Sequence, residues 1–107
     1  MLSRTTDASL SLAELQQIVR DVEGTGYQLK TLVGKTQDGV PFNHLTFEVS
    51  PKLPNTGPYT LLIRLPAGTT DPEKDPAVKD ALAKGAKLLF TSLVYVSGSL
   101  VSVTAVL

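Results

Sequence analysis

The C-terminal stretch, residues 82–107, constrains the fold of this chain more than any other segment. It begins with a helix-compatible segment that ends at Lys84-Gly85, and a long run rich in β-branched and aromatic residues follows. Ser97-Gly98-Ser99 breaks this run once, after which apolar Val101, Val103 and Ala105 alternate with Leu100, Ser102 and Thr104. The pattern predicts a short helix that leads into two consecutive strands joined by a tight turn.

A helix over residues 11–23 is predicted near the start of the chain. Ser11 and Glu14 have the spacing of a capping box, in which each side chain bonds the other residue's backbone N–H. Apolar residues then recur at helical spacing, at Leu12, Leu15, Val19 and Val22, and Gly24 and Gly26 supply the stop. Residues 1–8 are polar, and we expect them to be frayed.

Three further strands are predicted between this helix and the C-terminal stretch, over residues 27–35, 40–49 and 59–65. The first two are separated by Gln37-Asp38-Gly39, and Asp-Gly is a strong hairpin signal. Gly34 inside the first strand predicts a bend or bulge. Asp75-Pro76 predicts the start of the second helix, because proline is favoured at the first helical position.

The predicted order is therefore a helix followed by three strands, a second helix and two strands. The part from residue 27 onward has the connectivity of the OB-fold, a five-stranded Greek-key barrel with a helix between strands three and four. We expect a mainly β protein with residues 1–26 as an N-terminal arm and amphipathic helix, and residues 27–107 as an OB-like β-barrel domain. The alternatives are an α+β sandwich with an open antiparallel sheet, or a single long helix over residues 77–96.

The composition places the chain among globular proteins of one domain. It has 107 residues, of which 42% are hydrophobic, and no cysteine, so it has no disulfide framework and no thiolate metal site. No apolar run approaches the roughly 20 residues needed to span a bilayer, and the first residues lack the apolar core of a signal peptide. These features favour a cytoplasmic protein.

The charges cancel overall but are unevenly distributed. Ten basic residues balance ten acidic ones, which weighs against nucleic-acid binding because a basic surface supplies most of that affinity. The predicted strand regions, residues 27–66 and 84–107, nevertheless hold six basic against two acidic residues. Either the barrel is the basic part of the protein, or the helices simply tolerate Asp and Glu better than strands do.

Catalytic and metal-binding patterns are absent from the sequence. His44 is the only histidine, which leaves no metal-ligand set and no base for a serine nucleophile, and a surface strand position explains it better. Asp71, Glu73 and Asp75 lack the glycine and distal glutamate of a calcium loop. There is no glycine-rich phosphate loop. We therefore expect no enzyme activity, no cofactor and no metal.

Two motifs resemble the single-stranded DNA-binding protein family. Leu82-Ala83-Lys84-Gly85-Ala86-Lys87-Leu88 resembles the family's Leu-x-Lys-Gly-x-x-Val segment before strand four, and Val96-Ser97-Gly98-Ser99-Leu100 resembles its Val-x-Gly-x-Leu turn. The early strand with Gly34 and the Lys35–Gly39 hairpin followed by Phe42 fit the same layout. The resemblance implies an OB-fold, binding of single-stranded DNA, a role in DNA replication and an oligomeric state. The chain departs from the family in having no tryptophan, no acidic C-terminal tail and an extra N-terminal helix, which favours a diverged phage or plasmid-type binder.

The candidate binding residues follow from how proteins hold single strands, with aromatic faces that stack bases and cations that track phosphates. Phe42 and Phe47 differ by five positions, so they face opposite sides of a regular strand, and we expect Phe42 on the surface. Lys30 and Arg64 lie in the middle of predicted strands, where only a solvated face accommodates a charge cheaply. The candidate nucleic-acid-binding residues are Lys30, Lys35, Phe42, Tyr59, Arg64, Lys87 and Tyr95.

Two functional hypotheses from different classes remain open. The first is non-enzymatic binding of single-stranded nucleic acid, with DNA favoured, by a homo-oligomer. The second is a structural or adaptor subunit, for example a phage or complex component, that acts through protein contacts made by helix 11–23 or the C-terminal strand. The zero net charge and the missing tryptophan favour the second. A barrel that binds a small molecule is a third possibility.

Overall fold

The computed structural model describes residues 1–51 and 53–107. The elements follow in the order β1 (Leu2–Asp7), α1 (Leu12–Glu23), β2 (Tyr27–Gln37), β3 (Val40–Val49), β4 (Leu61–Leu65), a 3₁₀ turn (Pro72–Lys74), α2 (Pro76–Ala83), β5 (Leu88–Val96) and β6 (Ser99–Val106). The protein is mainly β, as the sequence predicts, and α2 lies between the strands that were predicted as third and fourth.

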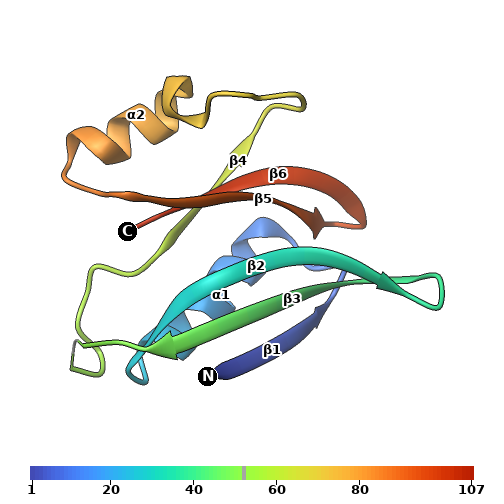
Figure 1. Cartoon of the computed structure of the whole chain (residues 1–107), viewed down its shortest axis with the longest axis horizontal. Helices are drawn as coiled ribbons and strands as arrows, with labels where there is room; N and C mark the ends of the chain where they lie inside the picture. The colour runs from blue at the N-terminus through green and yellow to red at the C-terminus, as the bar shows by residue number, and fades with distance from the viewer. Residues whose placement is uncertain (52) are drawn as a thin grey trace.

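The strands form two antiparallel sheets of three, in the orders β1-β3-β2 and β4-β6-β5. Figure 1 shows the two sheets as layers, with α1 behind them and α2 on the far side of the second sheet. Buried side chains of α1 and of both sheets meet in one core, which includes Leu15, Val19, Leu45, Phe47 and Val103. A second, smaller cluster around Val78 packs α2 against the outer face of the second sheet.

The prediction of a closed five-stranded barrel is wrong in two respects. There are six strands among the described residues, because Leu2–Asp7, expected to be frayed, forms β1 and pairs with β3 from Leu2↔Phe47 to Asp7↔Phe42. The barrel is also open. Since β1 occupies the second edge of β3, β4 has no place there and pairs with β6 alone.

The structure confirms three local features that the sequence predicts: the capping box of α1, the start of α2 and the turn between β2 and β3. The Ser11 hydroxyl accepts from the Glu14 N–H at 3.2 Å, and the Glu14 carboxylate accepts from the Ser11 N–H at 3.1 Å, which completes the capping box. Asp75 caps α2 by accepting from the Ala77 N–H at 3.0 Å. Asp38 and Gly39 join β2 to β3 with φ values of 52° and 78°, a conformation that Asp and Gly tolerate well.

Gly34 has a different role from the one that the sequence predicts. The bulge in β2 lies between Leu29 and Thr31, and Gly34 stays in register opposite Asn43. A Cβ atom at Gly34 would lie 3.0 Å from Tyr95 Cδ2 and 3.2 Å from Val94 Cα. Glycine is therefore needed because β5 approaches the backbone of β2 at this point.

Candidate nucleic-acid interface

The outer face of the β1-β3-β2 sheet brings two of the candidate binding residues together. Lys35 of β2 is directly opposite Phe42 of β3, and His44 is opposite Val33, two residues further along. Because directly opposite residues in antiparallel strands share a face, these four side chains lie on one surface. Phe42 and His44 are half-buried and Lys35 is exposed, whereas Phe47 points the other way and is fully buried.

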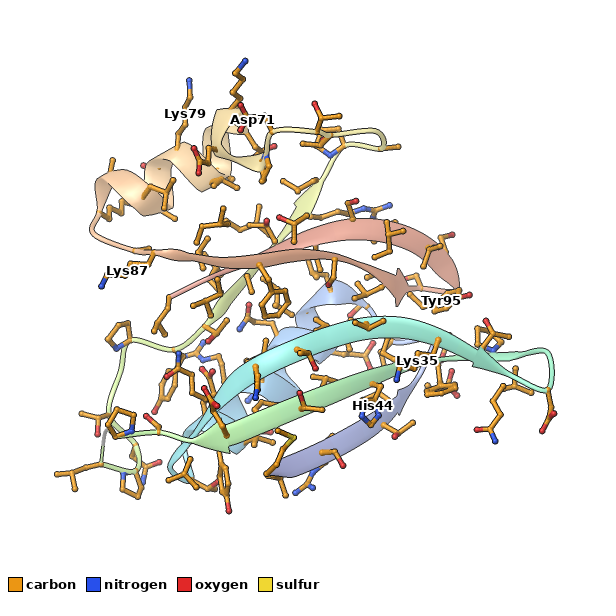
Figure 2. The ribbon with its side chains drawn as sticks, in the orientation of Figure 1. Lys35, His44, Asp71, Lys79, Lys87 and Tyr95 are labelled. Carbon is orange, nitrogen blue, oxygen red and sulfur yellow. The ribbon has the colours of Figure 1, made fainter. Side chains whose placement is uncertain are left out.

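Tyr95 of the second sheet contacts the opposite, inner face of the β1-β3-β2 sheet, where Gly34 and Asn43 lie. Its hydroxyl lies 3.2 Å from Thr36 Oγ1, and its ring lies against the backbone of Gly34. Figure 2 shows Lys35 and His44 on β2 and β3, and Tyr95 at the end of β5 in the second sheet. The β2–β3 hairpin also projects past the second sheet, as Figure 1 shows. We call Lys35, Phe42 and His44 the hairpin cluster.

The remaining candidate residues lie elsewhere. Lys30 is at the opposite end of β2 from Lys35, and its ammonium lies 3.9 Å from the Glu48 carboxylate. Tyr59 precedes β4, and the Arg20 guanidinium lies 5.6 Å above its ring centroid. Arg64 is exposed on β4, and Lys87, just before β5, lies at the far end of the second sheet from Tyr95 (Figure 2). The seven candidates therefore do not form one surface.

Glu23 is a buried acid that the sequence reasoning did not single out. Its carboxylate accepts from the Leu29 N–H at 2.8 Å, from the Thr60 N–H at 2.7 Å and from the Thr60 hydroxyl at 2.6 Å. These bonds join the end of α1 to β2 and to the segment before β4. An acid in the last turn of a helix faces the negative end of the helix dipole, and this unfavourable position was the signal in the sequence that it has a special partner.

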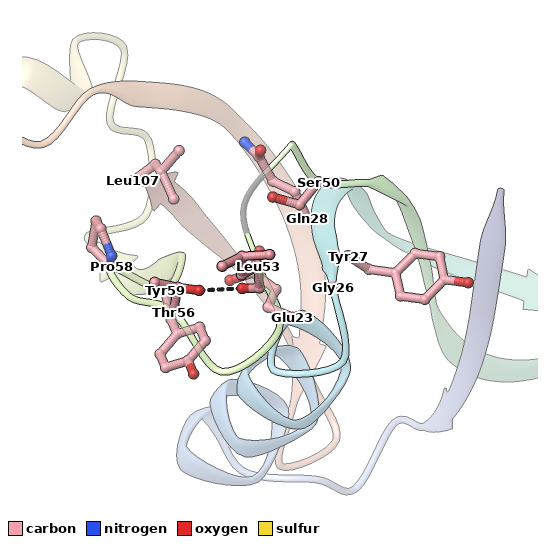
Figure 3. Close-up of a pocket in the computed structure, with 10 residues that line it drawn as sticks. All are labelled: Glu23, Gly26, Tyr27, Gln28, Ser50, Leu53, Thr56, Pro58, Tyr59 and Leu107. Atoms are coloured by element: carbon pink, nitrogen blue, oxygen red, sulfur yellow. Dashed lines mark hydrogen bonds between the residues drawn. The ribbon is translucent and has the colours of Figure 1, made fainter.

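The small cavity beside Glu23 leaves no space for a substrate. Figure 3 shows the lining, in which Glu23 lies beside Leu53 and Thr56 at the end of α1 while the Tyr27 ring points away from them. The cavity has a volume of about 10 Å³, which is enough for about one water molecule. With its carboxylate oxygens already accepting three hydrogen bonds, Glu23 acts as a structural link between elements.

The side-chain amides of Asn43 and Gln16 each hydrogen-bond backbone N–H and C=O groups of another element, as the backbone of a neighbouring strand would. The Asn43 Nδ2 donates to the Tyr95 carbonyl at 2.7 Å, and its Oδ1 accepts from the Tyr95 N–H at 2.8 Å, which ties β3 to β5. Gln16 of α1 donates from Nε2 to the Thr60 carbonyl and accepts at Oε1 from the Leu62 N–H, both at 2.7 Å. These contacts hold α1 to the second sheet and the second sheet to the first.

No group of three or more His, Cys, Asp or Glu side chains in residues 1–51 and 53–107 is arranged to hold a metal ion. Within the same ranges, neither helix has the length and apolar character required to cross a bilayer.

Comparisons with known proteins give no relative for this chain. No family model, no curated protein and no solved structure matches it.

Proposed function

We propose that this protein binds single-stranded nucleic acid, most favourably DNA, without catalysing a reaction. The observation that carries the proposal is the hairpin cluster, in which Phe42 lies directly opposite Lys35 on the same face of the sheet. An aromatic face next to a cation is the pairing that single-strand binding requires, since the ring stacks a base and the cation contacts the adjacent phosphate. His44, two residues along β3 on the same face, adds a further ring.

The arrangement of the strands supports the proposal. OB-type proteins bind oligonucleotides on the face of strands two and three and at the loops that follow strands one and four. In this chain those loops correspond to the Asp38-Gly39 and Ser97-Gly98 turns, and Figure 1 shows both turns at the same end of the molecule. The hairpin cluster lies beside them. We infer that the fold is an opened variant of the OB barrel, with β1 added to β3 and the contact between β2 and β5 made by side chains.

The charges on this surface predict modest affinity with weak dependence on salt. Lys35 has no ion pair among the described residues, whereas Lys30 is paired with Glu48. Two acids also lie nearby, Asp38 at the tip of the hairpin and Asp7 of β1 opposite Phe42. Few phosphates can be contacted by so few cations, so base stacking has to supply much of the binding free energy.

The test is fluorescence anisotropy of a labelled oligo-dT at two salt concentrations, with duplex DNA of the same length as the competitor. We expect the single strand to be preferred and binding to weaken as salt rises. Phe42→Ala should weaken binding by roughly 5- to 150-fold, the value of one stacked base. Lys35→Ala should weaken binding and lower the log–log salt slope by about 0.7, the contribution of one phosphate contact on a single strand.

Matched controls separate this surface from the rest of the protein. Lys79→Ala removes an exposed cation of α2, on the far side of the second sheet from the hairpin cluster (Figure 2), and should leave the affinity unchanged. Equal effects of Lys79→Ala and Lys35→Ala would indicate nonspecific attraction. Absence of binding to oligo-dT at low salt would contradict the proposal.

The second candidate function, a structural or adaptor subunit, is favoured by an apolar surface on the second sheet. Leu93 of β5 and Leu100 of β6 are 54% and 52% exposed, and they border a hollow of about 280 Å³ that Leu65 and Pro66 also line. Solvent-exposed leucines that are close together are typical of a protein contact. In this case Leu93→Ser would abolish partner capture while Phe42→Ala would have no effect on it.

A further inference from the structure

The two outer edges of this fold differ in how they are protected. One outer edge belongs to β4, where Gln16 and Glu23 of α1 bond the Thr60 and Leu62 backbone and so block the approach of another strand. The other belongs to β1, which pairs with β3 on one side and with none of the described residues on its other side. Figure 1 shows β1 at the margin of its sheet. An unprotected edge is a template for another strand.

We propose that β1 is the interface of a homodimer, in which the β1 strands of two copies pair antiparallel and join the two β1-β3-β2 sheets. A dimer with twofold symmetry brings the same surface of both copies together, so β1 must pair with itself. If the two sheets are to be continuous, side chains directly opposite each other must lie on the same face. The twofold axis must therefore pass through one residue of β1, which then faces its own copy, and cannot pass between two neighbouring residues.

The sequence of β1 opposes one of these registers and is compatible with another. With the axis at Arg4, two guanidinium groups would stand opposite each other, and like charges in that position are destabilising. With the axis at Thr5, Thr5 faces the second copy's Thr5, Arg4 faces Thr6, and Ser3 faces Asp7. Every pair in this register is chemically compatible, because a hydroxyl meets a hydroxyl, a guanidinium meets a hydroxyl, and a hydroxyl meets a carboxylate.

Two pairs of threonines within the protein already make the contact that Thr5 would make across the axis. The hydroxyls of Thr31 and Thr46 are hydrogen-bonded across β2 and β3, and those of Thr91 and Thr104 are hydrogen-bonded across β5 and β6. Cross-strand Thr–Thr pairs of this kind stabilise antiparallel sheets.

Thr6 supplies an independent observation. Its hydroxyl oxygen is buried and has no hydrogen-bond partner among residues 1–51 and 53–107. Buried polar atoms are normally paired, so an unpaired one indicates a missing partner. In the Thr5-centred register, Arg4 of the second copy lies opposite Thr6. The Arg4 guanidinium now donates only to the carbonyl of its neighbour Ser3, at 3.1 Å, among the contacts of the described residues, and has donors to spare.

The inner side of β1 also has room for a second copy. A hollow of about 400 Å³ lies between β1 and α1, lined by Arg4, Thr6, Ile18 and Val22 among others. A strand added at the edge of β1 would cover this hollow and remove the half-buried side chain of Ile18 from water, which favours association.

The first experiment is sedimentation equilibrium of the full chain over a range of concentrations, without nucleic acid. We expect the mass to rise from 11.4 kDa towards twice that value as the concentration increases. Thr5→Lys places two ammonium groups at the axis and should weaken the dimer at least tenfold. Thr70→Lys, which adds the same charge at an exposed loop position, should leave the dimer unchanged. A monomeric mass at all concentrations, or a dimer that Thr5→Lys does not weaken, would overturn the proposal.

Single cysteine substitutions can test the register, because the chain has no cysteine of its own that would form other disulfides. Opposite Cα atoms in antiparallel strands lie about 4.5–5.5 Å apart, which is within the range of a disulfide. Thr5→Cys should therefore form a covalent dimer under mild oxidation, and Ser3→Cys, on the same strand and face, should form far less because Ser3 faces Asp7. Covalent dimers of Ser3→Cys in equal or greater yield would rule out the Thr5-centred register. Circular dichroism of each variant establishes that it is folded.

Discussion

Asn43 pairs with the backbone of Tyr95 as a strand residue would. Its amide nitrogen donates to the Tyr95 carbonyl at 2.7 Å, its amide oxygen accepts from the Tyr95 N–H at 2.8 Å, and the side chain is fully buried. β3 and β5 belong to different sheets, so no ladder connects them. One amide side chain thus supplies a local substitute for strand pairing at the junction of the two sheets.

Asn43→Asp should lower the free energy of unfolding by about 2–4 kcal/mol, because a carboxylate cannot donate to the Tyr95 carbonyl and would be a buried charge. Urea denaturation followed by circular dichroism measures the change. Asn55→Asp, at an exposed loop position, is the matched control. A loss for Asn43→Asp within about 0.5 kcal/mol, as for ordinary surface changes, would show that this pair does not hold the sheets together.

Gln16→Ala should destabilise the protein by about 1–2 kcal/mol, since it leaves the Thr60 carbonyl and the Leu62 N–H without their partners. It also uncovers the edge of β4, so we expect the variant to aggregate faster on heating than the unmodified protein. Gln17→Ala is the control, because the adjacent Gln17 is exposed and bonds only Asp21 among the described residues. Light scattering during a thermal ramp compares the variants, and identical behaviour would argue against a protective role for Gln16.

Gly34→Ala should cost about 1–3 kcal/mol of stability, as is usual when an atom is forced into a packed site. The added Cβ would lie 3.0 Å from the Tyr95 ring and 3.2 Å from the Val94 Cα, and the backbone atom cannot move aside easily. Thermal unfolding of Gly34→Ala and of Gly34→Ala combined with Tyr95→Ala measures the two contributions. The cost of Gly34→Ala should be smaller, but not zero, when Tyr95 is alanine, and equal costs in both backgrounds would exclude the Tyr95 ring as a cause.

Asp7 should titrate below its usual value. The Ser9 backbone N–H donates to Asp7 Oδ1 at 2.8 Å, and this bond lowers the pKa of the Asp7 carboxyl below 3.8 because it favours the charged form. The stability that this bond contributes is therefore present above pH 3.8 and is lost as the pH falls through the lower, folded-state pKa. Carboxyl NMR measures the midpoint, with a short peptide containing Asp-Ala-Ser as the reference. A midpoint in the protein at or above that of the peptide would contradict the assignment.

Much of the secondary structure follows from short-range chemistry that a sequence shows directly. The Ser11 and Glu14 capping box, the Asp75-Pro76 start of α2 and the Asp38-Gly39 turn each depend on residues within four positions of one another. The opposite orientation of Phe42 and Phe47 follows in the same way, from the alternation of side chains along a strand. Such features are predictable because the interacting groups are neighbours in the chain.

The candidate surface was predictable only in part. Lys35 and Phe42 flank the same predicted hairpin, so their proximity is a local consequence of the turn. Tyr95 contacts Gly34 on the opposite face of β2, and Arg64 and Lys87 lie away from Lys35 and Phe42 on the second sheet. Residues that belong to different strands share a surface only when the order of those strands brings them together, which no single strand specifies.

The sequence by itself determined the approximate bounds of the helices and of every strand except β1, which residues cap the two helices, and that Phe42 and Phe47 face opposite sides of β3. Tertiary structure alone decided that the described strands form two separate sheets and no closed barrel. Leu2–Asp7 is polar and carries no strong strand signal, but it finds paired backbone partners along β3, and this pairing displaces β4 from that edge. The buried amide and carboxylate of Asn43 and Glu23 then replace the missing ladder contacts. The free energy of such pairing depends on partners more than 30 residues away in the chain, so it exists only in the folded protein.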